Sequence, residues 1–313
     1  MGSWRTSAVV VALILSTTLW VAGAAPHPDA PGPLAQAASV GPAPNPALPP
    51  SHDLLKKMRA AVRLDDDAQQ AYTYLERRRD VKVSMFGKVT VGPLRTFEVY
   101  PSNKPGRTYK RLIEIDGKPL PAAELARRDE EHRRNVLAEI ERDRAETPAA
   151  RQARLAKDAR ERREREAIIG DAFAVFEARI AGYDVIDGQR AVVLWISPRR
   201  NAQPRTREGR YMTKFAGRIW VVEGDGEIVK VDLTAFDDIS VGAGIVGRVH
   251  EGARLEFVRR RVNDEAWLPA SSHITAKGKT LLFRSFDFDL RTDYRDYKKF
   301  TVDTKVTYDT PKQ

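Results

Sequence analysis

The feature that constrains this chain most is the segment 214–269, whose pattern predicts antiparallel strands joined by short turns. β-Branched and aromatic residues are frequent there and alternate with polar ones, as in strands that bury one face. Asp225-Gly226 supplies the positive-φ positions of a tight hairpin turn, and Asn263-Asp264 marks a second turn. The predicted strands lie at residues 215–223, 227–234, 254–261 and 265–269. Turns this short predict a meander rather than βαβ units, which need a long crossover connection.

Strand patterns recur on both sides of this segment and are bounded by turn residues, among them the turns at Asp116-Gly117 and Asp187-Gly188. They lie at residues 81–86, 89–91, 94–100, 109–115, 173–181, 183–186, 190–196, 271–276, 280–286 and 299–308. A generous count gives about ten or eleven strands, which is more than an isolated open sheet holds unless it curls. We therefore predict a mainly β (α+β) fold built on a curved antiparallel sheet.

Residues 1–24 have the three parts of a secretory signal peptide: Arg5 in a short polar start, an apolar run at 8–21, and small residues at 22–24. The apolar run is short for a membrane span, so we expect cleavage and a periplasmic location rather than an uncleaved anchor. Loss of Arg5 lowers the formal net charge of +10 by one, to +9. The absence of cysteine excludes disulfides, thiolate catalysis, Cys-ligated metals and a lipidated cysteine.

Residues 25–50 are rich in Pro, Ala and Gly and almost free of charge, a composition that predicts a disordered linker. The pattern changes at Ser51, a residue suited to the N-cap of a helix. Beyond it, apolar residues recur at helical spacing, with lysines and arginines on the other face. We therefore expect a folded domain at 51–313 that opens with an amphipathic helix, and residues 72–79 are compatible with a second one.

The segment 118–168 differs from its surroundings, because its central part, 122–166, carries both signs of charge and no aromatic residue. Opposite charges at three- and four-residue spacing predict a long, solvated helical insertion. Its arginines are compatible with a nucleic-acid arm, but acidic residues nearly cancel them and aromatic stacking partners are missing. We therefore expect no nucleic acid as a partner. Residues 199–208 are polar and basic, which predicts a mobile loop.

Patterns that usually signal a catalytic or cofactor site are weak in this sequence. Gly242–Gly247 has the glycine spacing of a dinucleotide-binding loop, but a basic strand follows where a βαβ unit needs a helix, which favours a flexible connection. The five histidines show no metal-ligand spacing. Ser271, Ser272 and His273 are adjacent, but without a Gly-x-Ser-x-Gly turn they are better explained as polar residues of a strand edge. We expect no catalytic residue, no metal and no cofactor.

Bulky aromatic residues are distributed one or two per strand along the second half of the chain. On a curved sheet some of them converge on the concave face, where they fill the interior or line a cavity. Core packing explains each residue taken alone, whereas the whole set suggests an apolar ligand site. The candidate ligand-binding residues are Trp195, Trp220, Phe257, Trp267 and Phe283.

Together, these features resemble the LolA/LolB-like outer-membrane lipoprotein-sorting superfamily. The resemblance rests on a leading helix, a long meander, the run Phe215-Ala-Gly-Arg-Ile-Trp220 before a Gly-Asp-Gly hairpin, and Trp267-Leu-Pro269. It is best over residues 170–308 and weaker over 51–117, and the charged insertion departs from it. The resemblance implies an incomplete β-barrel, a curved sheet capped by helices, whose apolar hollow holds acyl chains in the periplasm.

By this resemblance the chain is a non-catalytic periplasmic binding or carrier protein for lipoprotein acyl chains or another hydrophobic ligand. A carrier needs only an apolar concavity, because each buried methylene contributes about 0.8 kcal/mol. The positive net charge adds transient contact with anionic membrane surfaces. An alternative is an envelope sensor or interaction module of the same fold that binds a protein partner through the insertion. A secreted hydrolase is disfavoured, because no nucleophile or metal set is evident.

Overall fold

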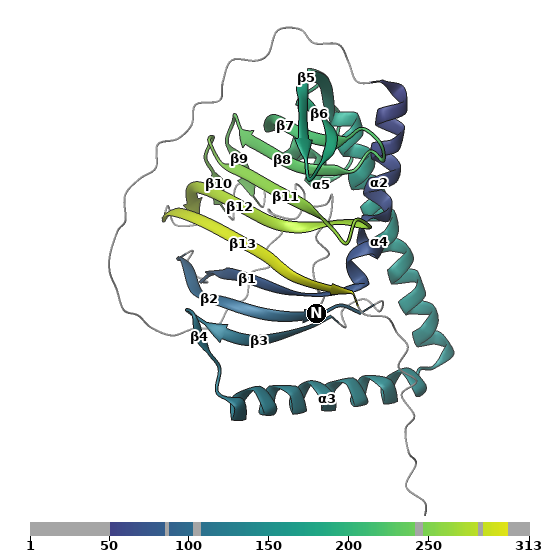
Figure 1. Ribbon diagram of the computed structural model, residues 1–313, viewed down its shortest axis with the longest axis vertical. Coiled ribbons are helices and arrows are strands. Elements are labelled where there is room, and N and C mark those ends of the chain that lie inside the picture. The colour runs from purple at the N-terminus through teal and green to yellow at the C-terminus, as the bar shows by residue number, and fades with distance from the viewer. Residues whose placement is uncertain (1–50, 85–87, 103–107, 242–246, 281–283, 300–313) are drawn as a thin grey trace, which may run out of the picture.

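One antiparallel sheet of 13 strands dominates the computed structural model (Figure 1). The structure describes residues 51–84, 88–102, 108–241, 247–280 and 284–299. The strands are β1 (Tyr72–Val83), β2 (Val89–Tyr100), β3 (Tyr109–Ile115), β4 (Lys118–Pro119), β5 (Phe176–Ile186), β6 (Gln189–Pro198), β7 (Phe215–Val222), β8 (Ile228–Ala235), β9 (Ile239–Val241), β10 (Gly247–Val249), β11 (Arg254–Val262), β12 (Ala266–Thr280) and β13 (Ser285–Lys299). Their order is β4-β3-β2-β1-β13-β12-β11-β8-β7-β6-β5, with β9 and β10 paired beside β12. The sheet is not closed, because β4 and β5 end this order.

Four helices accompany the sheet in the described part of the chain. They are α2 (His52–Gln70), α3 (Ala122–Arg144), α4 (Pro148–Val175) and α5 (Arg207–Met212). The expected N-cap of the first helix is confirmed, since the amide of Leu54 donates to Ser51 Oγ at 3.2 Å. The charged segment is helical as predicted, but it forms two helices. Thr147 is the N-cap of the second, and its Oγ1 accepts a hydrogen bond from the Ala150 amide.

The path of the chain explains why the charge-rich helices lie where they do. Strands β1 to β4 run outward to one edge of the sheet, and the chain re-enters the sheet at the opposite edge, in β5. Helices α3 and α4 make this crossing: Figure 1 shows α3 below β3 and α4 along the side of the sheet. The last described strand then pairs with the first, with Tyr72 opposite Lys299 and Arg78 opposite Thr292. The first and last strands of the described chain therefore pair in the middle of the sheet.

Four of the hairpin turns lie where the sequence predicts them. Each carries backbone with φ between 46° and 79°, the left-handed region that Gly, Asn and Asp adopt most readily. The turn residues with these angles are Asp116 and Gly117, Asp187 and Gly188, Gly226, and Asn263 and Asp264. The meander of β7, β8, β11 and β12 is confirmed, with β9 and β10 as an excursion between its second and third strands.

The two faces of the sheet differ in what covers them. On one face, Leu54 and Met58 of α2 pack with Leu194, Ile219 and Leu233 in the largest apolar cluster. We call this the helix face, and the opposite one the far face. Because side chains alternate along a strand, the neighbours of these core residues point to the far face. The helix face therefore holds the main hydrophobic core, under α2.

The prediction of a possible second helix at residues 72–79 was wrong, because this segment is the first half of β1. Tyr72, Tyr74 and Glu76 alternate toward the helix face and are nearly buried. They gain this burial by pairing with β2 and with β13, more than 200 residues away in sequence. A local pattern cannot reveal a partner at that distance.

Other boundaries also differ from the prediction. The strand predicted at 173–181 begins at Phe176, because α4 continues to Val175 and its last turns pack against Met212 of α5. The pieces predicted at 265–269 and 271–276 are one strand, β12, and β13 covers 285–299, most of which was not predicted as strand. Five predictions lie outside the described residues: the signal peptide (1–24), the linker (25–50), most of the glycine segment (242–246), Phe283 and the strand at 299–308, apart from Lys299.

Candidate functional site

The structure does not bring the predicted aromatic residues to one place. Trp220 and Trp267 lie together in an apolar cluster on the far face, and Phe257 is buried on the helix face, where it is paired with Val231 of the main core. Trp195 is only partly buried and stands opposite Arg218. The proposed ligand set is therefore divided between two faces of the sheet, and its role in binding stays a prediction.

The two buried tryptophans are tightly enclosed, with 6% of Trp220 and 4% of Trp267 exposed. Trp220 Nε1 donates to Asp184 Oδ2 at 3.0 Å, and Lys230 Nζ lies 4.4 Å from the ring centroid of Trp220. The turn between β5 and β6 closes over this region, since Asp187 Oδ2 accepts a hydrogen bond from the Arg261 amide. Trp220 and Trp267 are therefore packed side chains of the protein interior.

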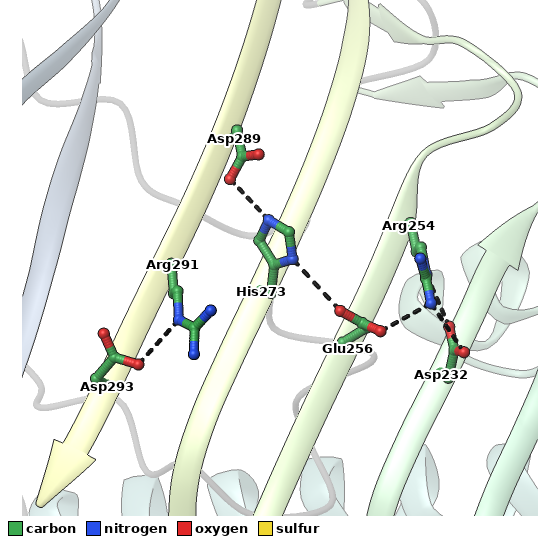
Figure 2. Close-up of polar contacts among 7 residues, drawn as sticks. All are labelled: Asp232, Arg254, Glu256, His273, Asp289, Arg291 and Asp293. Atoms are coloured by element: carbon green, nitrogen blue, oxygen red, sulfur yellow. Dashed lines mark hydrogen bonds and ion pairs between the residues drawn. The ribbon is translucent and has the colours of Figure 1, made fainter. Parts of the chain in front are cut away.

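A row of charged side chains crosses the far face over β8, β11, β12 and β13 (Figure 2). Arg254 binds Asp232 through two hydrogen bonds of 2.9 and 3.0 Å and also donates to Glu256 at 2.7 Å. His273 follows, with Nδ1 3.4 Å from Glu256 Oε2 and Nε2 2.7 Å from Asp289 Oδ1. Apart from the Arg254–Glu256 contact within β11, these contacts join neighbouring strands and hold the polar face of the sheet in register.

This charged row does not have the geometry of a catalytic or metal site. Glu256 and Asp289 bind opposite nitrogens of the His273 ring, so the three groups do not converge on a common point. Within the described ranges, no group of three His, Cys, Asp or Glu residues is arranged to hold a metal ion. Ser272 is paired with Phe257 and so points to the helix face, away from His273. A Ser–His couple between these two neighbours is therefore excluded by the pleat.

The helix face has a different character over β1, β2 and β13, where aromatic side chains replace aliphatic ones. Tyr74, Val99 and Tyr294 are buried there, with Phe97 and Tyr297 packed against them. The Tyr74 ring centroid lies 6.0 Å from that of Tyr294 and 5.2 Å from that of Tyr297. We call these five residues the aromatic cluster.

The tyrosines of this cluster keep their hydroxyl protons. Burial, together with the nearby charge of Glu76, raises the pKa of Tyr74 and of Tyr294 well above the ordinary value. The hydroxyl of Tyr297 donates a hydrogen bond of 2.7 Å to the carbonyl oxygen of Pro269. The cluster therefore presents rings and neutral phenols rather than phenolates.

Beside the aromatic cluster lies a nearly buried carboxylate, Glu76, which is 3% exposed. Lys110 Nζ binds its two oxygens at 3.0 and 2.7 Å, and Arg78 Nε approaches one of them at 3.1 Å. Arg78 stands directly opposite Arg95 in the β1–β2 pairing, and like charges in this arrangement repel each other. Asp80 relieves the repulsion, because its oxygens lie 3.3 Å from Arg78 Nε and 2.8 Å from Arg95 Nη1.

The result is a row of alternating charges on the helix face, Lys110–Glu76–Arg78–Asp80–Arg95, which we call the ion row. It contains three cations and two carboxylates, so its formal charge is +1. Its cations are about one quarter to one third exposed, so the row lies between core and solvent. The Arg78 guanidinium also lies 5.5 Å from the ring centroid of Phe97, which joins the ion row to the aromatic cluster.

The sequence interpretation missed both the ion row and the aromatic cluster. One signal was available: the alternation Tyr72-x-Tyr74-x-Glu76 has the period of a strand and not of a helix. The partners Lys110, Arg95 and Tyr294 come from other strands, and only the register of the sheet places them beside β1.

Comparisons with known proteins give no assignment: no family model, no curated protein and no solved structure matches this chain. None of the helices in the described ranges is both long enough and apolar enough to cross a membrane. The function must therefore be argued from the site itself.

Proposed function

We propose that this chain is a periplasmic binding or carrier protein for a hydrophobic ligand, such as the acyl chain of a lipoprotein. In this proposal the sheet is an incomplete β-barrel, and the ligand lies on its helix face over β1, β2 and β13. The observation that carries the proposal is the aromatic cluster, a group of buried apolar and aromatic side chains on the same face of the sheet as the main core. Aromatic and aliphatic surfaces with few polar groups are what ligand sites for hydrophobic molecules consist of.

The remaining features of the chain are compatible with such a role. A signal peptide at 1–24 would deliver the chain to the periplasm, and the positive net charge would favour brief contact with anionic membrane surfaces. A carrier needs no catalytic group, and its affinity arises from the apolar area that it removes from water.

Native mass spectrometry of the chain purified from the periplasm without detergent tests this function. A carrier is expected to retain an acyl ligand, visible as a discrete mass increment and recoverable by lipid extraction. Phe97→Asp should weaken binding of a fluorescent fatty-acyl probe, because a charge would enter the aromatic cluster. Phe236→Asp is the matched control, since Phe236 is an exposed residue just after β8. A ligand-free protein that also fails to bind the probe would rule out the carrier.

One observation favours the alternative of a protein-binding sensor. Helix α3 has no buried residue, and many of its charged side chains are exposed. A partner could dock there through charge pairs. Deletion of residues 122–166 is a poor test, because α3 and α4 connect the two edges of the sheet. Charge reversal on α3, with Arg133→Glu and Arg134→Glu, should abolish partner capture if the sensor function is correct, and should leave probe binding unchanged.

A further inference from the structure

We infer that the ligand carried on the helix face is an amphiphile with an anionic head group, held by Arg78, Arg95 and Lys110. This inference rests on the proposed function and narrows it to a class of ligand. It comes from two features that lie side by side, the aromatic cluster and the ion row, which together match an apolar chain and a charged head.

The sign of the head group follows from the charge balance of the ion row. Its three cations are offset by only two carboxylates, Glu76 and Asp80. The tyrosines beside it are neutral, because burial raises the pKa values of Tyr74 and Tyr294. The ion row therefore carries one uncompensated positive charge in a partly desolvated place, where an anion is favoured.

The free hydrogen-bonding capacity of the row also belongs to its cations. Each carboxylate already meets two cations: Glu76 contacts Lys110 and Arg78, and Asp80 contacts Arg78 and Arg95. By contrast, the Nε atom of Arg95 is buried and has no hydrogen-bond partner among the described residues. A buried N–H without an acceptor is costly, and an oxyanion placed at Arg95 would remove that cost.

The geometry gives the ligand a direction. The stack of Arg78 over Phe97 marks the boundary between charged and aromatic surface. The head group would lie at Arg95 and Arg78, toward the ends of β1 and β2 that are nearest their connection. The alkyl chain would extend over Phe97 and Tyr74 toward Tyr294 and the seam with β13.

Calorimetric titration of the purified chain with C12 amphiphiles, below their micelle concentrations, tests the inference. Dodecyl phosphate and dodecanoate carry anionic heads, dodecyl maltoside a neutral one and dodecyltrimethylammonium a cationic one. We expect the anionic compounds to bind at least about tenfold more tightly than the neutral one, as one charge-assisted contact provides. The preference should shrink as salt is added.

Two substitutions that remove charges of opposite sign test whether the head group lies at the ion row. Arg95→Gln should reduce the preference for dodecyl phosphate over dodecyl maltoside by about tenfold, whereas Asp80→Asn should increase it. Arg291→Gln is the matched control, because it removes the same charge from the far face and should leave the preference unchanged. Thermal unfolding of each variant identifies any that has lost its fold, and the neutral amphiphile reports binding that is independent of the head.

The outcomes separate this inference from the function on which it rests. Equal affinity for neutral, cationic and anionic amphiphiles would contradict the inferred preference for an anionic head group, but it would remain compatible with the proposed carrier function. Binding of none of the four would overturn both. Inorganic phosphate alone, bound as tightly as dodecyl phosphate, would show a simple anion site and contradict an amphiphile. A preference that responds equally to Arg95→Gln and Arg291→Gln would place the head group elsewhere.

Discussion

Glu76 shows how much a single residue of the helix face depends on partners from another strand. It is nearly buried, and it accepts hydrogen bonds from Lys110 while it pairs with Arg78. Glu76→Gln removes the negative charge and leaves two cations facing each other. We expect the free energy of unfolding to fall by about 2 to 3 kcal/mol, because a charged group that loses its partner in a desolvated place is costly.

Asp289→Asn is the control for this measurement, since Asp289 is an exposed carboxylate that pairs with His273 on the far face. Exposed ion pairs contribute little to stability, so no measurable change is expected. Denaturant unfolding of the two variants gives the comparison. If Glu76→Gln is as stable as the parent chain, the ion row is not a structural unit and the charge argument built on it loses its basis.

Trp267 offers a second prediction at this scale. With 4% of its surface exposed and Trp220 packed beside it, Trp267→Ala should lower the free energy of unfolding by about 3 to 5 kcal/mol. Trp195→Ala should cost clearly less, because Trp195 is only partly buried. Fatty-acyl probe binding by the folded fraction then decides the ligand role of these tryptophans. If either variant lost probe binding at unchanged stability, the ligand site would lie on the far face, at the tryptophans, and not on the helix face.

At the scale of elements, α3 is attached to the sheet by few contacts. Asp129 accepts hydrogen bonds from Arg111 at 2.8 and 2.7 Å and from the Tyr109 hydroxyl at 2.8 Å, and His132 stacks on the Tyr109 ring at 3.7 Å. Asp129→Asn should therefore speed hydrogen exchange of the α3 amides at pH 7. Glu130→Gln, which breaks only a pair within the helix, should not. Equal exchange in both variants would show that this contact does not hold α3.

The same contact has a defined pH dependence. The hydrogen bond from Arg111, followed by that from Tyr109, lowers the pKa of Asp129. Because the folded state lowers this pKa, the contact contributes fully above the unfolded value of about 3.9, and it is lost as the pH falls through the lower, folded value. The attachment of α3 should therefore be constant near neutral pH and weaken only in strong acid.

The segment 199–208, predicted as a mobile loop, is tied down by α4. Asp171 accepts from the Arg205 and Thr206 amides and from Thr206 Oγ1 at 2.6 Å, and a Cβ on Gly209 would lie only 2.2 Å from its Oδ2. We therefore expect the parent chain to resist trypsin in this segment and Asp171→Ala to expose the segment to it. Asp158→Ala, on the exposed part of α4, is the control. Rapid cleavage of the parent chain at 199–208 would contradict the contact.

The elements that the sequence predicts well are those encoded by neighbouring residues. Asp187-Gly188 and Asp225-Gly226 define their hairpins because their backbone angles are a local property. The charged helices also follow from local spacing. β1 was misjudged because its burial depends on β13, and the ion row was invisible because it requires the register that places Arg78 opposite Arg95. Local patterns identify strands, whereas only long-range pairing determines which side chains meet.

At the scale of the whole molecule, the order of the strands determines what the helix face can do. The first and last described strands meet in the middle of the sheet, so the aromatic cluster combines residues from both halves of the chain, such as Tyr74 and Tyr294. The sequence predicted an antiparallel, mainly β fold, but not the place where the ends join. For the same reason, the site proposed from the structure, at the seam between β1 and β13, differs from the site predicted from the sequence, which was at the tryptophans of the meander.

The most direct test of a ligand on the helix face is photo-crosslinking with a diazirine-bearing dodecyl phosphate, followed by peptide mapping. The account predicts saturable labelling of peptides that contain residues 72–80, 95–99 and 292–297, and competition by unlabelled dodecyl phosphate. Labelling concentrated around Trp220 and Trp267, or labelling that does not saturate, would contradict it.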